Sequence, residues 1–405
     1  MIRERIINKM IKDYRHLLLL GCISVMIGLL VGAIDALFGR ILLIITDYRS
    51  EHTFQLLPFL PIAGVLIVYA YQRLGKNSSK GMSLIFAAGF EEEKTIPKRL
   101  IPLIIVSTWM THLFGGSAGR EGVAVQIGGT VSHAIGRKLH LHEYAKVFII
   151  TGMAAGFAGL FQTPLAAIFF ALEVLTVGSL EYSALFPSII ASFTASFTSH
   201  TLGLEKFRVT IPEVYDLSVL LAVKIVIISI LFGITGGLFA HILMHCKLNI
   251  NKIIKNNILR IFIIGIILSA LLLVLHQGRY AGLGTNIIQE CMNAKEFYWY
   301  DWLLKLIFTI ITLTAGFQGG EVTPLFSIGA GLGAALGSMF GLPVTMTAAL
   351  GYAAVFGSAT NTLLAPIFIG AEVFGYEYLP YFFIVCAFAY IFNGNKSIYS
   401  AQRLR

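Results

Sequence analysis

The chain contains an internal repeat, and no other feature of the sequence limits its possible folds as strongly. Segments 152–174 and 351–373 share residues at an offset of 199 positions, and the glycine-rich segments 116–121 and 316–321 share residues at an offset of 200. Both halves hold short apolar segments interrupted by glycine, a pattern typical of membrane proteins that bind a ligand between two repeats. The sequence therefore predicts two related halves with a binding site where they meet.

The composition places these halves in a membrane. Hydrophobic residues make up 57% and charged residues 13% of the 405 positions, and the mean hydropathy is +0.80. Soluble domains carry about 25% charged residues, so we expect an all-α, multi-pass membrane protein. Sustained two-residue alternation, the pattern of a β-barrel, is missing from the sequence. The cysteines lack paired spacing and the histidines lack metal-ligand spacing, so we expect neither a metal nor another cofactor.

The basic residues indicate orientation. The net charge of +9 arises mainly from lysines and arginines near the N-terminus, in loops and at the C-terminus. Such clusters favour the cytoplasmic side, so we expect both termini in the cytoplasm and contact with lipid rather than nucleic acid. Residues 1–15 are predicted to form a cytoplasmic amphipathic helix, residues 16–205 the first membrane repeat and residues 206–405 the second. No C-terminal regulatory domain is expected.

Apolar runs and glycine breaks predict where the helices lie. The run that starts at Met82 and ends at Gly89 is too short to cross a bilayer, so it is predicted to be a half-helix buried in protein. The other helices are expected at residues 16–46, 55–72, 100–114, 123–138, 145–160, 164–179, 183–200, 217–245, 257–276 and 301–315.

The segment 115–123, with the sequence GGSAGREGV, is the most informative part of the first half. Glycine and alanine dominate it up to Arg120, which indicates a bend where the backbone comes close to another group. A helical pattern follows, with small residues at four-residue spacing that suit close helix contact. The amide groups of residues 121–125 are therefore predicted to open a helix inside the bilayer, where they would attract an anion.

Glu121 lies at the start of this predicted helix. A carboxylate there competes with a free anion for the same hydrogen-bond donors, and it can leave the site by taking up a proton. Charged residues at membrane depth are costly and usually functional. The alternative is a glutamate at a helix end that faces water.

The residues Gly119, Arg120, Glu121 and Gly122 closely resemble the gating-glutamate motif of the CLC chloride channels and transporters. The resemblance covers residues 15–400 approximately. It implies a CLC-type inverted repeat of tilted and broken transmembrane helices, and a homodimer with one pathway per subunit. The family usually has proline where this chain has Val123.

The second half repeats the glycine-rich bend at residues 316–324, with Pro324 in the expected first turn of a helix. By resemblance to the family, the backbone amides near Val322 and Thr323 contact the central anion, and the Thr323 hydroxyl is a further donor. Glu321 within this bend departs from the usual chloride-transporter pattern.

Two further positions carry the resemblance. Chloride-selective members commonly have a serine that holds the anion where this chain has Met82. Tyr399 resembles the tyrosine whose hydroxyl closes the inner end of the anion site, and a phenol donates a hydrogen bond without carrying charge. Met82, Val322, Thr323 and Tyr399 are therefore the predicted anion-binding and selectivity residues.

The departures at Met82, Val123 and Glu321 resemble the bacterial CLC branch that exchanges fluoride for protons. Chloride/proton exchangers often have a second glutamate directly after the position of Glu173, but here Val174 follows, so Glu321 becomes the natural proton station beside Glu121. The resemblance thus implies a secondary active transporter that exports fluoride across the bacterial inner membrane. Gly119, Arg120, Gly122 and Val123 are predicted to support the site.

Other functions remain open at this point. A chloride/proton exchanger or a passive anion channel would use the same scaffold. An intramembrane enzyme is disfavoured because neither motif contains a nucleophile with a base or a metal set. Glu173 and Glu372, at equivalent positions of the two halves, are predicted to be buried structural carboxylates that cap neighbouring helices.

Overall fold

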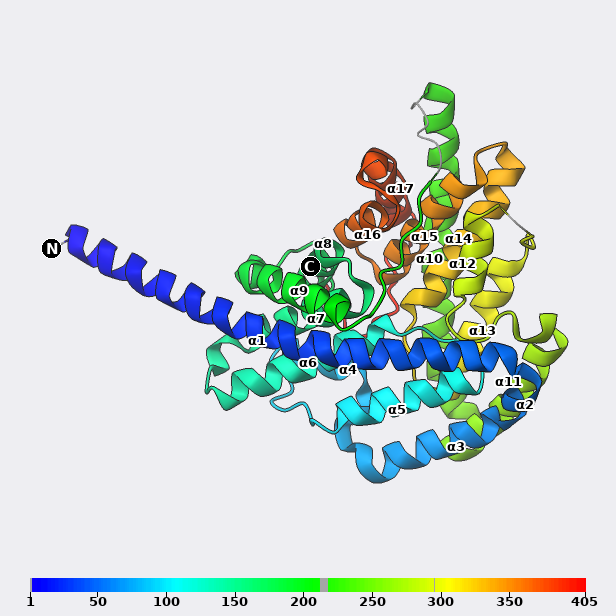
Figure 1. Cartoon of the computed structure of the whole chain (residues 1–405), viewed down its shortest axis with the longest axis horizontal. Helices are drawn as coiled ribbons and strands as arrows, with labels where there is room; N and C mark the ends of the chain where they lie inside the picture. The colour runs from blue at the N-terminus through cyan, green and yellow to red at the C-terminus, as the bar shows by residue number, and fades with distance from the viewer. Residues whose placement is uncertain (1, 212–217, 295) are drawn as a thin grey trace.

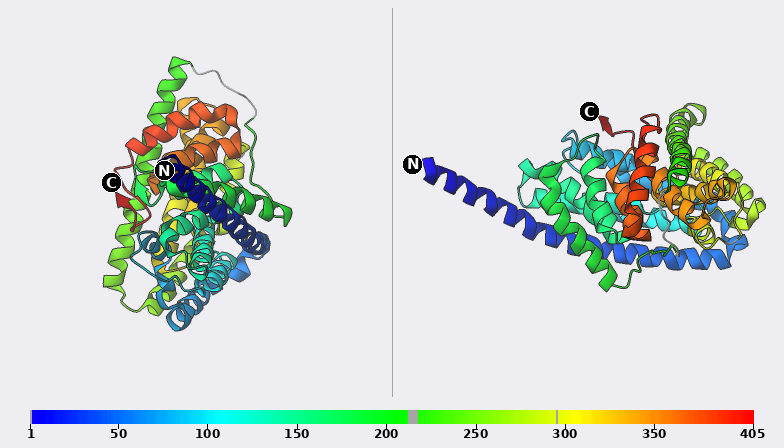
Figure 2. Two further views of the ribbon diagram at one scale, coloured as in Figure 1. Left: turned by 90° about the vertical axis from the view of Figure 1, so that its left-hand side faces the viewer. Right: turned by 90° about the horizontal axis from the view of Figure 1, so that it is seen from above.

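The computed structural model describes the backbone of residues 2–211, 218–294 and 296–405, and the side chains of these ranges from residue 16 onward. Helices form most of the described structure (Figure 1). Figure 2 shows the helices of the first half (blue to green) and those of the second half (green to red) side by side in one body. The protein is therefore built as the repeat predicts, from two joined helical halves.

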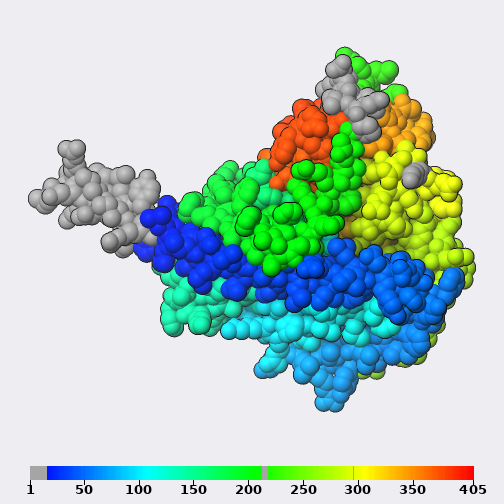
Figure 3. Space-filling model, viewed as in Figure 1, coloured from blue at the N-terminus to red at the C-terminus, as the bar shows by residue number. Residues whose placement is uncertain are grey.

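The first half begins with α1, a single helix over Ile2–Glu51. The later elements of this half are α2 (Thr53–Leu56), η1 (Leu57–Phe59), α3 (Leu60–Ala70), the π-helical turn η2 (Tyr71–Gly75), η3 (Lys76–Lys80), α4 (Met82–Gly89), α5 (Leu100–Leu113), α6 (Glu121–Lys138), η4 (His142–Tyr144), α7 (Ala145–Phe161), α8 (Pro164–Glu173), η5 (Tyr182–Ala184) and α9 (Leu185–Thr201). Figure 3 shows α1 as a blue band across one face, with α9 (green) and α5 (cyan) on its two sides.

The second half begins with α10 over Val219–Ile253. It continues with α11 (Asn257–Val274), η6 (His276–Gly278), α12 (Thr285–Met292), α13 (Asp301–Ala315), α14 (Val322–Phe340), α15 (Val344–Thr360), α16 (Leu364–Phe374), η7 (Tyr376–Tyr378) and α17 (Leu379–Ile391). The strands β1 (Thr176–Val177) and β2 (Arg403–Leu404) pair in parallel and tie the C-terminus to the first half.

The described residues contain six helical segments that are long and apolar enough to cross a membrane. These are His16–Glu51, Thr53–Gly89, His142–Phe161, Val219–Ile253, Asn257–Val274 and Val322–Phe340. Shorter apolar helices, among them α5, α8 and α16, lie between them. Helices too short to span are stable at membrane depth only where protein covers their ends. The buried residues of α8 and α16 meet this condition.

Matching segments of the two halves meet each other in three places. Gly119 and Gly320, in the two glycine-rich bends, form an antiparallel bridge, with N···O distances of 2.5 and 2.8 Å. The rings of Phe169 and Phe368, which are matching positions, stack with centroids 4.5 Å apart. The two repeats are therefore related by an approximate two-fold axis.

Glu173 and Glu372 are the third such pair. The carboxylate of Glu173 accepts hydrogen bonds from the first amides of α16, at 2.8 to 3.1 Å, and that of Glu372 accepts from the first amides of α8, at 2.9 and 3.2 Å. Each repeat therefore caps a helix of the other. The prediction that both glutamates are buried helix caps is confirmed.

Glycines let the helices within each repeat approach closely. A Cβ atom added at Gly128 of α6 would overlap with the carbonyl oxygen of Gly152 in α7. One added at Gly329 of α14 would overlap with the carbonyl oxygen of Gly351 in α15. The predicted small-residue stripes are thus the contact lines of α6 with α7 and of α14 with α15.

Some predicted boundaries differ from the observed ones. The separate helix expected within residues 1–15 is part of α1, because no glycine or proline interrupts the chain before Gly21. Its predicted amphipathic side chains lie outside the described residues, and the domain division stays a prediction. The helix expected to reach residue 179 ends at Glu173, because the chain becomes extended at Thr176–Val177 to form β1. Neither α12 nor the β-pair was expected.

Candidate functional site

The bend before α6 meets the bend before α14 at the centre of the protein. Gly115 adopts a φ of +90°, which favours glycine. A Cβ at Gly119 would lie 2.9 Å from the Gly320 carbonyl oxygen and 2.8 Å from the ring of Pro324. The glycines of both motifs are therefore required for the two helix starts to touch.

Glu121 is the first residue of α6, but its carboxylate reaches the N-terminus of α14, the matching helix of the other repeat. Its Oε2 atom accepts hydrogen bonds from the Thr323 hydroxyl at 2.5 Å, the Thr323 amide at 3.1 Å and the Arg120 amide at 3.3 Å. Its Oε1 atom lies 3.7 Å from the Nε atom of Arg120 and accepts no hydrogen bond from the described residues. Glu121 is fully buried.

This arrangement puts the Glu121 carboxylate on the donors that an anion would use. The first turn of α14 combines an amide without an intrahelical partner, a hydroxyl and the positive end of the helix dipole. Because the Glu121 side chain is fully buried, the alternative of a water-facing glutamate is wrong. Removing the carboxylate would leave the Thr323 donors open to a free anion.

Glu321 occupies the N-cap position of α14 but faces elsewhere. Its Oε1 atom lies 3.4 Å from the Nζ atom of Lys247 on α10. The side chain of Glu321 is 14% exposed and that of Lys247 is 41% exposed. The lysine was not a predicted site residue, because it stands in a basic cluster typical of an orientation signal.

Glu321 opens into a cavity of about 330 Å³, which we call the inner cavity. Met82 at the start of α4 and Tyr399 near the C-terminus also line it. The Tyr399 ring packs against Phe86 of α4, with centroids 5.4 Å apart. The fold therefore brings three predicted site residues from distant parts of the sequence to one space.

A second cavity of about 690 Å³, the outer cavity, reaches Arg120 from another direction. It contains Thr53, where the helical run 53–75 begins, whereas the inner cavity contains Ser79, just beyond the end of that run. The run is roughly 35 Å long at ~1.5 Å per residue. The two cavities thus approach the central motif from opposite ends, with Glu121 between them.

Comparison with known proteins agrees with this geometry. The sequence model of the family described as "Voltage gated chloride channel" matches residues 63–394. The chain belongs to this family, the CLC proteins. It is 37% identical to a chloride/fluoride channel protein of Pseudomonas syringae pv. tomato, over 94% of this chain and 85% of that protein. Its structure matches the crystal structure of a CLC-type fluoride/proton antiporter with a TM-score of 0.95 and 52% identity. The match covers 97% of this chain and 99% of that one.

More distant CLC proteins share the fold. The structure of a slow cyanobacterial Cl⁻/H⁺ antiporter matches with a TM-score of 0.81 at 19% identity, over 93% of this chain and 95% of that one. The H⁺/Cl⁻ exchange transporter ClcA of Salmonella arizonae is 23% identical over 98% of this chain and 91% of its own length. The predicted CLC fold with inverted repeats is therefore confirmed.

The predicted site residues of this CLC protein fall into two groups. Gly119, Arg120, Glu121 and Thr323 meet at the bridge between the repeats, and Met82, Glu321 and Tyr399 line the inner cavity. The buried residues Val123 and Val322 belong to the first turns of α6 and α14, and Gly122 packs against Gly320. The geometry fits the proposed parts of the site, but the role of each residue stays a prediction.

Lys305 is a buried cation that the sequence analysis missed. Its Nζ atom donates to the Ser117 hydroxyl at 2.9 Å and to the carbonyl oxygens of Tyr280 and Gly282 at 3.1 and 2.7 Å. Ser117 belongs to the central bend, so the ammonium group holds that bend against the loop before α12. A lone lysine in the apolar helix α13 was the available signal.

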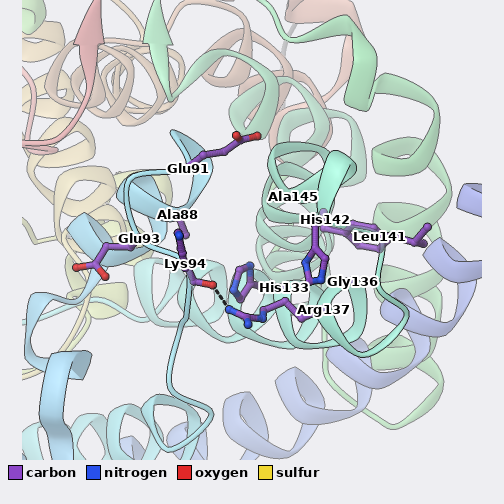
Figure 4. A pocket seen from close by; sticks show the side chains of 11 residues that line it. Ala88, Glu91, Glu93, Lys94, His133, Gly136, Arg137, Leu141, His142 and Ala145 are labelled. Carbon is purple, nitrogen blue, oxygen red and sulfur yellow. Dashed lines mark hydrogen bonds between the residues drawn. The ribbon is translucent and has the colours of Figure 1, made fainter.

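A third cavity, of about 360 Å³, lies where α4 and α6 end (Figure 4). Figure 4 shows Arg137 donating to the backbone oxygen of Lys94 beside His133 and His142. The described residues contain no cluster of His, Cys, Asp and Glu that could hold a metal ion. This cavity does not touch the bridge between the repeats.

Proposed function

We propose that this CLC protein exports fluoride in exchange for protons. The observation that carries the proposal is the Glu121 carboxylate on the Thr323 amide and hydroxyl, between the inner and outer cavities. The resemblance of the chain to a CLC-type fluoride/proton antiporter at 52% identity supports the choice of substrate. The relative named a chloride/fluoride channel protein supports the same anion.

The exchange follows from competition for one set of donors. Protonation removes the charge of Glu121, so its side chain leaves the Thr323 donors and a fluoride ion takes its place. Fluoride is small and strongly hydrated, and amide and hydroxyl donors replace part of its water shell. When the proton leaves on the other side, the carboxylate returns and expels the anion. Fluoride and protons therefore move in opposite directions.

Glu321 and Tyr399 serve the inner end of this pathway. In this proposal Glu321 passes protons between the inner cavity and Glu121, and the Tyr399 hydroxyl donates to the anion. Met82 supplies no hydroxyl at the start of α4, which disfavours the usual coordination of chloride. The inner cavity then faces the cytoplasm of a bacterial cell, with both termini on that side of the inner membrane.

The proposal also includes a homodimer with one pathway in each subunit. Exposed apolar side chains occur on α9 and on α10, including Phe197 and Leu231, and a second copy or lipid would cover them. Crosslinking of the purified protein at these two helices, followed by gel analysis, tests the assembly.

Flux from proteoliposomes tests the exchange itself. Vesicles containing the purified protein and loaded with fluoride should release it while the external pH rises, because protons enter as fluoride leaves. Chloride loaded at the same concentration should leave much more slowly. Equal flux of both anions without a pH change would indicate a passive channel, and equal proton-coupled flux would indicate a chloride/proton exchanger.

A further inference from the structure

Lys247 lines the inner cavity beside Glu321, where it can contact both an anion and the proton-carrying carboxylate. Four titratable side chains line the inner cavity among the described residues: Lys80, Lys247, Glu321 and Tyr399. Lys80 donates a hydrogen bond of 2.5 Å to Glu93, which is not part of the cavity lining. Lys247 is therefore the lysine that faces Glu321, with 3.4 Å between the Nζ and Oε1 atoms.

The charges in the cavity balance when it holds no ion. Lys247 contributes one positive charge and Glu321 one negative charge, while Tyr399 is neutral and Glu121 lies on the other side of the bridge at Thr323. A fluoride ion would add a negative charge beside the carboxylate of Glu321, whose side chain is only 14% exposed, and this is unfavourable without a compensating positive charge. A proton on Glu321 supplies that charge.

We propose that Lys247 couples fluoride entry to proton uptake by exchanging the carboxylate of Glu321 for the incoming fluoride ion. The ammonium group turns from Glu321 to fluoride, and Glu321 takes the proton that Glu121 delivers as it loses its partner. The anion and the proton reach the cavity from opposite sides, so the net charge of the cavity does not change. This inference rests on the proposed fluoride/proton exchange and assigns a residue that the family motifs leave out.

The test measures the protons that the protein takes up when fluoride binds. Purified full-length protein in detergent and minimal buffer is titrated with sodium fluoride, while a pH electrode records proton uptake and calorimetry records binding. The wild-type protein should take up protons with fluoride. K247M should take up fewer protons per bound fluoride and bind fluoride roughly two- to fivefold more weakly, the scale of a partly exposed ion pair.

Two further variants define the cause. K247R keeps the positive charge, so it should restore proton uptake close to the wild-type value. K252M removes a lysine from the same helix that contacts Asn249 instead of the cavity, so it should behave as wild type. Because Lys247 is 41% exposed, K247M should fold, and its elution in size-exclusion chromatography checks this.

The result that overturns the inference is a proton-to-fluoride ratio in K247M equal to that of the wild type. A ratio that falls in K247M but is not restored in K247R also overturns it, because the effect would then not depend on charge. Failure of the proposed function is a separate result, since wild-type vesicles would then show no exchange of fluoride for protons.

Discussion

The N-termini of α6 and α14 are counterparts in the two repeats, but their glutamates lie in different surroundings. Glu121 is the first residue of α6, and its fully buried carboxylate crosses the bridge to the donors of α14. Glu321 is the N-cap of α14, and its partly exposed carboxylate pairs with Lys247 in the inner cavity. One repeat thus supplies the carboxylate and the other supplies the donors that hold it.

The comparison shows how a symmetric backbone supports an asymmetric task. The mutual hydrogen bonds of Gly119 and Gly320 and the paired caps of Glu173 and Glu372 preserve the two-fold relation. The side chains break it, because Lys305 lies on α13, whereas its counterpart α5 carries neither lysine nor arginine. A transport direction needs such a difference, since identical halves would treat the two membrane sides alike.

The largest effect is expected from E121Q. Glutamine cannot carry a proton between the two sides, so proton-driven uphill movement of fluoride should fall to the level of protein-free vesicles. Fluoride flux with pH recording measures this loss. E143Q, which changes an exposed glutamate of η4, should transport as wild type. Retention of uphill transport by E121Q would contradict the role given to Glu121.

T323V sharpens the comparison by removing one donor of α14. The hydroxyl bonded to Glu121 at 2.5 Å is lost, while the amide remains. Fluoride binding by calorimetry should weaken by roughly 10- to 150-fold, because a hydrogen bond to a charged group contributes about 1.5–3 kcal/mol. T345V changes a threonine in the first turn of α15, which bonds to the Met292 carbonyl, and should leave the affinity unchanged. Equal affinities in both variants would place the anion elsewhere.

K305M tests how much the buried lysine stabilises the bend before α6, which it contacts through Ser117. Methionine fills a similar volume but removes three hydrogen bonds and leaves the carbonyl oxygen of Tyr280 without its donor, whereas Ser117 keeps Thr309 and Gly282 keeps the Ala118 amide. Unfolding of the variant should require about 1–3 kcal/mol less free energy, the cost of an unsatisfied buried group. Thermal unfolding in detergent measures the change. K146M, which breaks a partly exposed pair with Glu181, should cost less than about 1 kcal/mol.

The smallest effects are expected where the repeats are most alike. E173Q and E372Q each keep one carbonyl acceptor but lose the charge that the capped helix favours. Glu173 accepts from three amides and Glu372 from two, so E173Q should lower the unfolding temperature more than E372Q. Thermal unfolding of the two variants side by side checks the order, and the reverse order would contradict the capping account.

Much of the site could be predicted because its parts are local in sequence. Glu121 and Glu321 stand out as acids within glycine-rich bends, and the matching positions of the two halves predict that the bends meet. Lys247 could not be assigned, because a lysine near the end of an apolar helix is typical of an orientation signal. Its contact with Glu321 depends on how α10 packs beside α14, which no local pattern shows.

The sequence by itself determined the helical membrane fold, the two repeats and the helix starts, because apolar length, glycine spacing and proline position act over a few residues. Only the tertiary structure decided which donors hold Glu121 and which lysine faces Glu321. A helix N-terminus attracts any nearby anion, and the packing of the two repeats determines which carboxylate reaches it.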